Sequence, residues 1–137
     1  MFFLAALVLF LDQLTKLLVE RALPLDTSRV MVEGFFSLVH WGNTGAAWSL
    51  FHGKNLILAG IGAVSLVAIY HFRHHFEFAR PGGQIALGMM CGGILGNLAD
   101  RIFRGHVVDF LYFFIQTRQG REIGYPAFNI ADIGICT

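Results

Sequence analysis

Three groups of polar residues lie in or beside apolar stretches of this sequence. Polar side chains at membrane depth are costly, so they are candidates for a functional site. Each group contains a carboxylate. In two of the groups an asparagine precedes the aspartate at a spacing of i, i+3, which places the amide and the carboxylate on one face of a helix. The groups are Asn97, Asp100 and Arg101; Asp109; and Asn129 with Asp132.

Two of these acids also have structural interpretations. Asp100 fits a local ion pair with Arg101 as well as it fits a functional role. Asp132 has the spacing of an acid in the first turn of a helix, where it could bond free backbone N–H groups. Asp109 is set among apolar residues, which should disfavour its ionised form.

Taken together, Asp109 and Asp132 predict a carboxylate pair. The segments that carry them should meet at the same membrane surface, because two antiparallel spans flank the connection between them. Two carboxylates that share a site split their pKa values, so that one is a base for water and the other an acid for a carbonyl oxygen. This is the chemistry of an aspartic protease, and it requires no cofactor.

Other hydrolytic sites are less well supported by the residues. The sequence contains no Gly-x-Ser-x-Gly motif and no His-Glu-x-x-His motif. His71, His74 and His75 have helical spacing, but interfacial solvation explains them better than a metal site does. Cys91 and Cys136 lie in apolar stretches and are interpreted as packing residues. We therefore expect no metal.

The composition of the chain indicates which class of protein positions these residues. The chain has 137 residues, of which 55% are hydrophobic and only 14% are charged, with a formal net charge of +1. So few charges disfavour a soluble domain, and so much apolar surface excludes disorder. The balance of charge offers no basic surface for nucleic acid. The class that remains is an integral membrane protein.

We predict one membrane domain over residues 1–137 with four spans, at about 2–23, 55–72, 83–103 and 126–137. About 18 helical residues cross most of a hydrocarbon core. In the first span, Asp12 and Lys16 are spaced i, i+4 and should form a structural ion pair. The fourth apolar stretch is short, so we expect the last helix to be truncated and the natural protein to continue.

The connections divide between the two sides of the membrane. Residues 24–53 and 104–124 should lie on one side, and 73–80 on the other. The short connection carries Arg73 and Arg80, which favours the cytoplasm. Residues 30–50 are rich in β-branched and aromatic side chains and predict a small strand-containing element. Residues 105–116 predict an amphipathic segment along the interface.

Five motifs in order resemble the bacterial lipoprotein signal peptidases, the type II signal peptidases. They are Asp-Gln-Leu-Thr-Lys at 12–16, Asn-Thr-Gly-Ala-Ala-Trp at 43–48, Gly-Asn-Leu-Ala-Asp-Arg at 96–101, Val-Val-Asp-Phe at 107–110 and Phe-Asn-Ile-Ala-Asp at 128–132. The resemblance covers nearly the whole chain, and five motifs in order are highly specific.

The resemblance implies a mainly α-helical bundle of four transmembrane helices with a small extracytoplasmic β-cradle and an interfacial helix near residues 106–116. It implies an aspartic endopeptidase of the bacterial inner membrane, with its site toward the extracytoplasmic face. The substrate would be a diacylglyceryl-modified prolipoprotein, cut N-terminal to the lipidated cysteine. We expect contact with membrane lipids and a monomer.

On matching positions, the resemblance implies that Asp109 and Asp132 are catalytic. Polar residues that hold the substrate or the pair would be Asn43, Asn97, Arg101 and Asn129. Asp12, Lys16 and Asp100 would support them. The alternative is a proton- or ion-coupled transporter subunit, in which the aspartates relay cations, although the inverted repeats typical of many such carriers are not visible. A purely structural scaffold would leave the clustered Asn and Asp residues unexplained.

Overall fold

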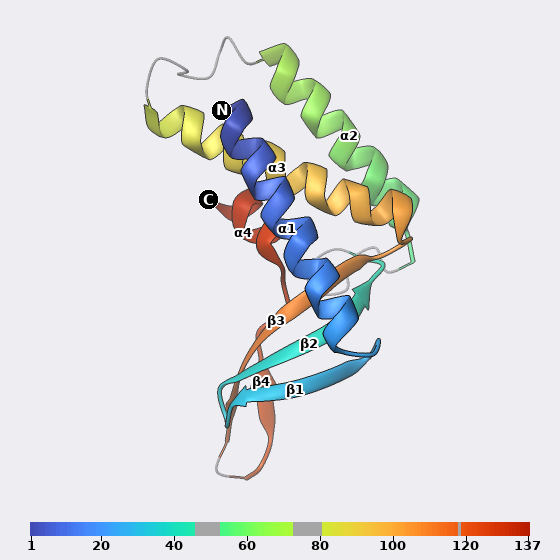
Figure 1. The fold of residues 1–137 in the computed structure, drawn as a ribbon, viewed down its shortest axis with the longest axis vertical. Helices are drawn as coiled ribbons and strands as arrows, with labels where there is room; N and C mark the ends of the chain where they lie inside the picture. The colour runs from blue at the N-terminus through green and yellow to red at the C-terminus, as the bar shows by residue number, and fades with distance from the viewer. Residues whose placement is uncertain (46–52, 73–80, 118) are drawn as a thin grey trace.

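The computed structural model describes residues 1–45, 53–72, 81–117 and 119–137. It is mainly helical, with a small antiparallel sheet at one end of the helices (Figure 1). This confirms the predicted class of fold at that level. The predicted short connection 73–80, with His74 and His75, lies outside the described residues.

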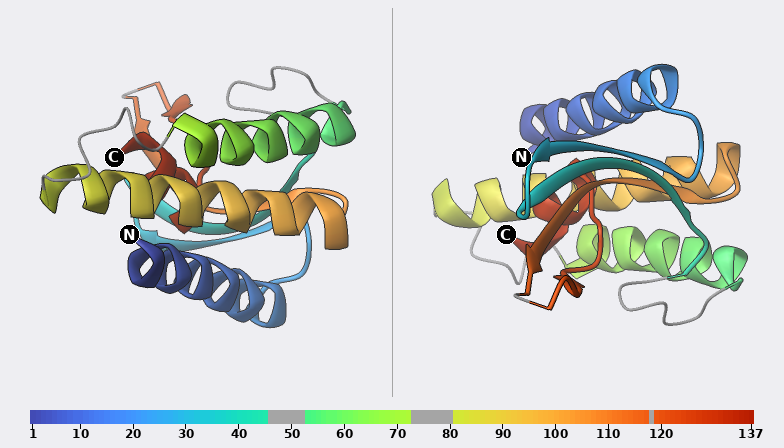
Figure 2. Two further views of the ribbon diagram at one scale, coloured as in Figure 1. Left: turned by 90° about the horizontal axis from the view of Figure 1, so that it is seen from above. Right: turned by 90° about the horizontal axis from the view of Figure 1, so that it is seen from below.

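In the described part of the chain, three helices are long and apolar enough to cross a membrane: α1 (Phe2–Ala22), α2 (Asn55–Phe72) and α3 (Pro81–Phe103). Helix α3 lies between α1 and α2, as both views of Figure 2 show. No side chain of α2 is buried, whereas α1 and α3 bury polar residues against each other. An apolar surface of this kind suits a lipid environment.

Close approach of α1 to α3 depends on a glycine. A Cβ added at Gly96 would lie 2.5 Å from Asp12 Oδ2, well inside van der Waals contact. Small residues at a helix interface allow backbones to approach in this way. Gly96 therefore makes room for the carboxylate of Asp12 in the interior of the bundle.

The sheet has the order β1-β2-β3-β4, with every pair antiparallel. Its strands are β1 (Thr27–Val32), β2 (Phe36–Asn43), β3 (Val107–Gln116) and β4 (Glu122–Gly124). Strands from the two longer predicted connections thus pair directly, with Trp41 opposite Asp109. The predicted strand-containing element at 30–50 is present in its described part.

The prediction of an interfacial helix near residues 106–116 is wrong. Val107–Gln116 is the longest strand of the sheet, and its Val107–Phe110 side chains are buried. The segment is rich in β-branched and aromatic residues, which suit a pleated, half-buried surface. The segment is therefore a strand because β2, far earlier in the chain, supplies the hydrogen-bonding partner.

Helix α4 (Ile130–Cys136) begins later than residue 126, where the fourth span was predicted to start. Phe128 is held in the sheet: its N–H donates to Leu111 O (3.0 Å), and its carbonyl accepts from the N–H groups of Phe110 (3.1 Å) and Leu111 (2.9 Å). Asn129 then caps the helix. The pairing with β3 therefore sets where α4 starts.

Candidate active site

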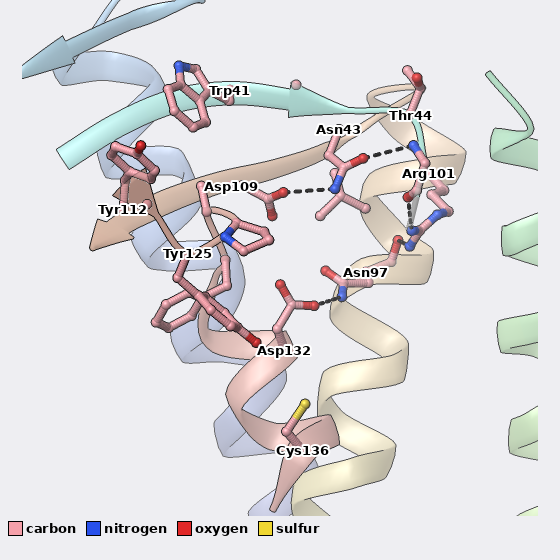
Figure 3. A pocket seen from close by; sticks show the side chains of 17 residues that line it. Trp41, Asn43, Thr44, Asn97, Arg101, Asp109, Tyr112, Tyr125, Asp132 and Cys136 are labelled. Carbon is pink, nitrogen blue, oxygen red and sulfur yellow. Dashed lines mark hydrogen bonds between the residues drawn. The ribbon is translucent and has the colours of Figure 1, made fainter. Parts of the chain in front are cut away.

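A cavity of about 640 Å³ lies where the sheet meets α3 and α4 (Figure 3). One side carries polar residues of the end of β2 and of α3, and the other carries aromatic residues of the sheet and of the segment before α4. Both Asp109 and Asp132 line the cavity and point into it. The lining also includes Trp41, Asn43, Thr44, Gly45, Asn97, Arg101, Tyr112, Tyr125, Phe128 and Cys136.

Asp109 is held by two amides from opposite sides. Asn43 Nδ2, at the end of β2, donates to Asp109 Oδ2 at 3.0 Å, and Asn129 Nδ2 donates to Asp109 Oδ1 at 2.8 Å. The side chain is 4% exposed and belongs to the sheet, outside the spanning helices. Its position follows from the pairing of β2 with β3, which brings Asn43 opposite Val107.

The electrostatic environment of Asp109 favours its neutral form. Burial raises the pKa of Asp109 to about 7, and the Asp132 carboxylate contributes to the same shift. The hydrogen bonds from Asn43 and Asn129 lower this pKa and only partly offset the burial. A carboxyl with a pKa near neutrality can exchange a proton at physiological pH.

Asp132 lies in the first turn of α4 and forms a capping box with Asn129. Asn129 Oδ1 accepts from the N–H of Asp132 (3.0 Å), and Asp132 Oδ2 accepts from the N–H of Asn129 (3.2 Å). The other carboxylate oxygen, Oδ1, accepts from Asn97 Nδ2 at 2.7 Å. Asp132 thus bonds a backbone N–H at the start of the helix, as its structural interpretation predicted. It also lines the cavity.

Asn129 connects the two acids. Its side chain is fully buried, and it donates to the carboxylate of Asp109 while it accepts from the backbone of Asp132. One amide therefore sets the relative position of the two carboxylates, since each of its ends is committed to a different partner.

Arg101 joins the end of α3 to the end of β2. Its guanidinium donates to Gly45 O (3.1 Å) and to Asn97 O (3.2 Å), while Asn55 Nδ2 donates to the Arg101 carbonyl (3.0 Å). The local ion pair of Asp100 with Arg101 that the sequence allowed is not the arrangement found. Asp100 instead faces α1, where it contacts Lys16 and Gln13.

A fully buried charge cluster lies behind the cavity, between α1 and α3. Lys16 Nζ is 2.8 Å from both Asp12 Oδ2 and Asp100 Oδ2, and it donates to Asn97 Oδ1 at 3.1 Å. The three charged side chains have no exposed surface. Since the Asn97 oxygen faces Lys16, its NH₂ group must face Asp132, so the cluster orients a donor to the cavity.

Asp12 also reaches α4, because its Oδ1 accepts from the N–H of Ala131 at 2.9 Å. An acid from α1 thereby satisfies a free N–H in the first turn of α4. The predicted ion-pair residues Asp12 and Lys16 thus bind each other and both neighbouring helices. This contact ties α4 to the buried cluster.

Several residues of this region went unassigned in the sequence. Trp41, Tyr112 and Tyr125 line the cavity, and the ring centroids of Trp41 and Tyr112 are 5.0 Å apart. Gln13 Nε2 donates to Asp100 Oδ1 at 2.9 Å, and Arg104 NH1 donates to the same oxygen at 2.7 Å. The i, i+4 spacing of Asp100 and Arg104 in the sequence could have predicted the contact between Arg104 and Asp100.

Among the described residues, no group of three or more His, Cys, Asp or Glu side chains could hold a metal ion. His74 and His75 fall outside that part of the chain. Cys91 and Cys136 are free thiols, and Cys136 lines the cavity instead of packing into the bundle.

A second cavity, of about 660 Å³, lies between α2, α3 and α4. Apolar side chains of these helices line it, including Leu58, Ile61, Met90, Ile94, Leu98 and Ile135. It shares Asn97, Arg101 and Asp132 with the first cavity. The two cavities thus meet at Asp132, and the second has the more apolar lining.

The family model described as "Signal peptidase (SPase) II" matches residues 4–137 of the chain. The "Lipoprotein signal peptidase" of Symbiobacterium thermophilum is 36% identical over 130 residues, which is 95% of this chain and 82% of that protein. The protein of the same name from Bacillus subtilis is 33% identical over 135 residues, 98% of this chain and 84% of its own.

Two solved structures of bacterial membrane enzymes, determined by the in meso method, share the fold. Their TM-scores are 0.81 and 0.75, each at 29% identity, and the match covers 98% of this chain and 79% and 83% of theirs. With the family match over nearly all of the chain, these likenesses establish that this protein belongs to the signal peptidase II family, a family of lipoprotein signal peptidases.

Proposed function

We propose that this chain is a membrane aspartic endopeptidase that removes the signal peptide from prolipoproteins, with Asp109 and Asp132 as its catalytic pair. The observation that carries the proposal is the pair itself: two carboxylates point into one cavity and are joined by the amide of Asn129. The sequence alone had placed these acids on one surface. The relatives are peptidases and give the transporter alternative no support.

The pair works as an acid and a base that share one proton. The ionised carboxyl takes a proton from water, whose oxygen attacks the scissile carbonyl carbon, while the protonated carboxyl gives its proton to the carbonyl oxygen. As the tetrahedral intermediate collapses, the carboxyl that holds the water proton gives it to the leaving nitrogen and the C–N bond breaks. A hydroxyl proton of the intermediate returns to the other carboxylate, so the pair again holds one proton. The reaction balances with one water, the substrate and the two carboxyls.

Amides and one cation hold the pair and the substrate backbone. Asn43 and Asn97 each donate one N–H to a catalytic carboxylate, and Asn129 joins the two. Arg101 lies where the two cavities meet, with part of its guanidinium already bound to Gly45 O. We assign Arg101 to the peptide carbonyls of the substrate, and Asp12, Lys16 and Asp100 to support of this arrangement.

The substrate enters from the membrane. The apolar cavity between α2, α3 and α4 suits an apolar part of the substrate, and it leads to Asp132. We propose that the cut falls N-terminal to a cysteine that carries diacylglycerol, so that the lipid stays in the bilayer while the peptide bond reaches the carboxylates. The aromatic residues Trp41 and Tyr112 of the sheet, and Tyr125 just after β4, would face the peptide.

We propose four spans in the bacterial inner membrane, the fourth beginning at α4. The sheet and the cavity face the extracytoplasmic side, and the protein acts as a monomer in contact with membrane lipids. A sheet at one end of the helices, in contact with α1 and α3, is consistent with a site at the membrane surface.

The test is a cleavage assay. The purified protein in detergent is incubated with a diacylglyceryl-modified lipobox peptide, and mass spectrometry identifies the cut. We expect cleavage directly before the lipidated cysteine. The same peptide with an unmodified cysteine is the matched control and should be cut more slowly. Cleavage at other positions, or equal rates on both peptides, would contradict the assigned substrate.

The pH profile is a second expectation. The pKa of Asp109 is raised to about 7, and the pair titrates as a unit. Above this value both carboxyls ionise, so the acid that protonates the carbonyl oxygen is lost. We expect kcat/KM to fall by about tenfold per pH unit on this alkaline side.

Asn43→Ala provides the check on this assignment. The hydrogen bond from Asn43 lowers the pKa of Asp109, so its removal should move the alkaline limb of kcat/KM to higher pH. A limb that stays in place in this variant, or a flat profile through neutral pH, would refute the role given to Asp109.

A further inference from the structure

Arg104, directly after α3, gathers four acceptors from two helices. Its Nε and NH2 donate to Glu20 Oε1 (2.8 Å) and Oε2 (3.2 Å) near the end of α1. Its NH1 donates to Gln13 Oε1 (2.8 Å) and to Asp100 Oδ1 (2.7 Å). A planar fork that binds one carboxylate at two points is the strong form of this contact. Arg104 thus joins α1 to the end of α3.

The buried cluster beside it is not neutral without this residue. Asp12, Lys16 and Asp100 are fully buried and hold two carboxylates against one ammonium. Arg104, whose side chain is 20% exposed, supplies the second positive charge through its ion pair with Asp100. A buried charge without a counter-charge is costly, so the ion pair with Arg104 stabilises the Asp100 carboxylate, while the partly exposed Glu20 pairs the other side of the guanidinium.

Asp100 passes this constraint to the start of β3. Its Oδ2 accepts from the N–H of Val108 at 3.1 Å, and Val108 is fully buried. The next residue is Asp109. The same carboxylate oxygen also contacts Lys16, so the position of the Val108 backbone depends on an Asp100 carboxylate held at both oxygens.

Gln13 is oriented by the same guanidinium. Because its Oε1 accepts from Arg104, its Nε2 faces inward, where it donates to Asp100 Oδ1 (2.9 Å) and to Gly96 O (3.2 Å). Gln13 Nε2 also donates to Asp12 Oδ2 (3.1 Å), so Arg104 adds to an orientation that these acceptors favour, and its loss would leave Oε1 without this donor. Arg104 NH1 thus acts on the Asp100 carboxylate both directly and through Gln13, while Nε and NH2 bind Glu20.

We propose that Arg104 is a positioning residue for catalysis: through Asp100 and the N–H of Val108, it holds Asp109 in the geometry that the pair requires. Glu20 anchors the guanidinium from α1. Arg104 does not touch the substrate and is absent from the lining of both cavities in the described part of the chain. This inference rests on the proposed catalytic role of Asp109.

Arg104→Gln should lower kcat while KM changes little. A small displacement of a catalytic group can cost a large part of the rate, so we expect kcat to fall by about 10- to 100-fold. Substrate binding, which depends on other residues, should hold KM within about twofold. Arg104→Lys keeps the charge but not the fork, and should recover part of the lost kcat.

A second background separates positioning from general destabilisation. If Arg104 acts through Asp100, adding Arg104→Gln to Asp100→Asn should cause little further loss of kcat, because the shared link is already altered. Arg21→Gln, which removes an exposed cation near the end of α1, is the matched control and should keep the kcat of the unsubstituted protein. Thermal unfolding of each variant in detergent reports its folded fraction.

The proposal is overturned if kcat of the folded Arg104→Gln protein is unchanged, if the loss is in KM, or if the losses with Asp100→Asn add in full. These results are distinct from a failure of the proposed function. In that case the unsubstituted protein would not cut the lipopeptide, or Asp109→Asn would still cut it.

Discussion

Asp109→Asn and Asp132→Asn are each expected to abolish cleavage of a diacylglyceryl-modified lipobox peptide. Either change removes the proton that the pair shares, because an amide can neither accept a proton from water nor give one to the carbonyl oxygen. General acid–base catalysis by a side chain contributes about 10²- to 10⁴-fold, and in the proposed mechanism the pair performs both roles, so the loss should be at the upper end. Single-turnover cleavage in detergent measures it.

Both variants should remain folded. Asparagine keeps the shape of aspartate, and Asp109 is a site where burial already favours the neutral form. Its pKa in the folded protein is about 7, above the ordinary 3.8, so the folded state loses stability as pH rises through that value. The Asp109→Asn protein lacks this titrating group, so its thermal unfolding temperature should depend less on pH between 3.8 and about 7.

Asp26→Asn is the matched control for these variants. Asp26 is exposed in the turn before β1, and it has φ 60, a conformation that asparagine also tolerates. The same chemical change there should leave the cleavage rate as it was. Substantial cleavage by either Asp109→Asn or Asp132→Asn, with Asp26→Asn normal, would show that the pair is not the catalytic centre.

Lys16→Met is expected to cause the largest loss of stability. Lys16 is fully buried and lies 2.8 Å from both Asp12 and Asp100. Removal of one partner from a buried ion pair leaves an uncompensated charge, which costs about 3–5 kcal/mol. The free energy of unfolding, measured by denaturation in mixed micelles, should fall by this order, and Asn97 should lose its fixed orientation toward Asp132.

A compensating change tests the reason for this loss. Lys16→Met combined with Asp12→Asn removes one positive and one negative charge, so the double variant should be more stable than Lys16→Met alone. Lys54→Met removes an exposed lysine before α2 and is the control. Equal stability of Lys16→Met and Lys54→Met, or a double variant weaker than either single one, would be inconsistent with a charge-balanced cluster.

The two carboxylates and their neighbours were identifiable from the sequence because membranes make polar residues conspicuous. Asp109 and Asp132 stood out against apolar neighbours, and the i, i+3 spacing of Asn129 with Asp132 is the geometry of the capping box that the structure has. The three long apolar helices were predictable for a similar reason, since hydropathy is a local property that needs no knowledge of distant contacts.

The errors have a common physical cause. Residues 106–116 were expected to form a helix, but β3 takes its backbone partners from β2, more than 60 residues earlier in the chain. The start of α4 was misplaced for the same reason, because Phe128 is bound to Leu111. A strand depends on a partner that its own sequence does not contain, so local pattern alone misassigns it.

By itself, the sequence determined that this is a membrane protein with a few polar residues where a bilayer penalises them, and it picked out the acids able to act as a pair. Only the tertiary structure decided how those acids are held. Asn129 sits between them, Lys16 orients Asn97, and Arg104 pairs with Glu20 of α1, each through contacts between distant segments. Composition and spacing report the cost of burying a polar group, whereas its partners depend on how the chain packs.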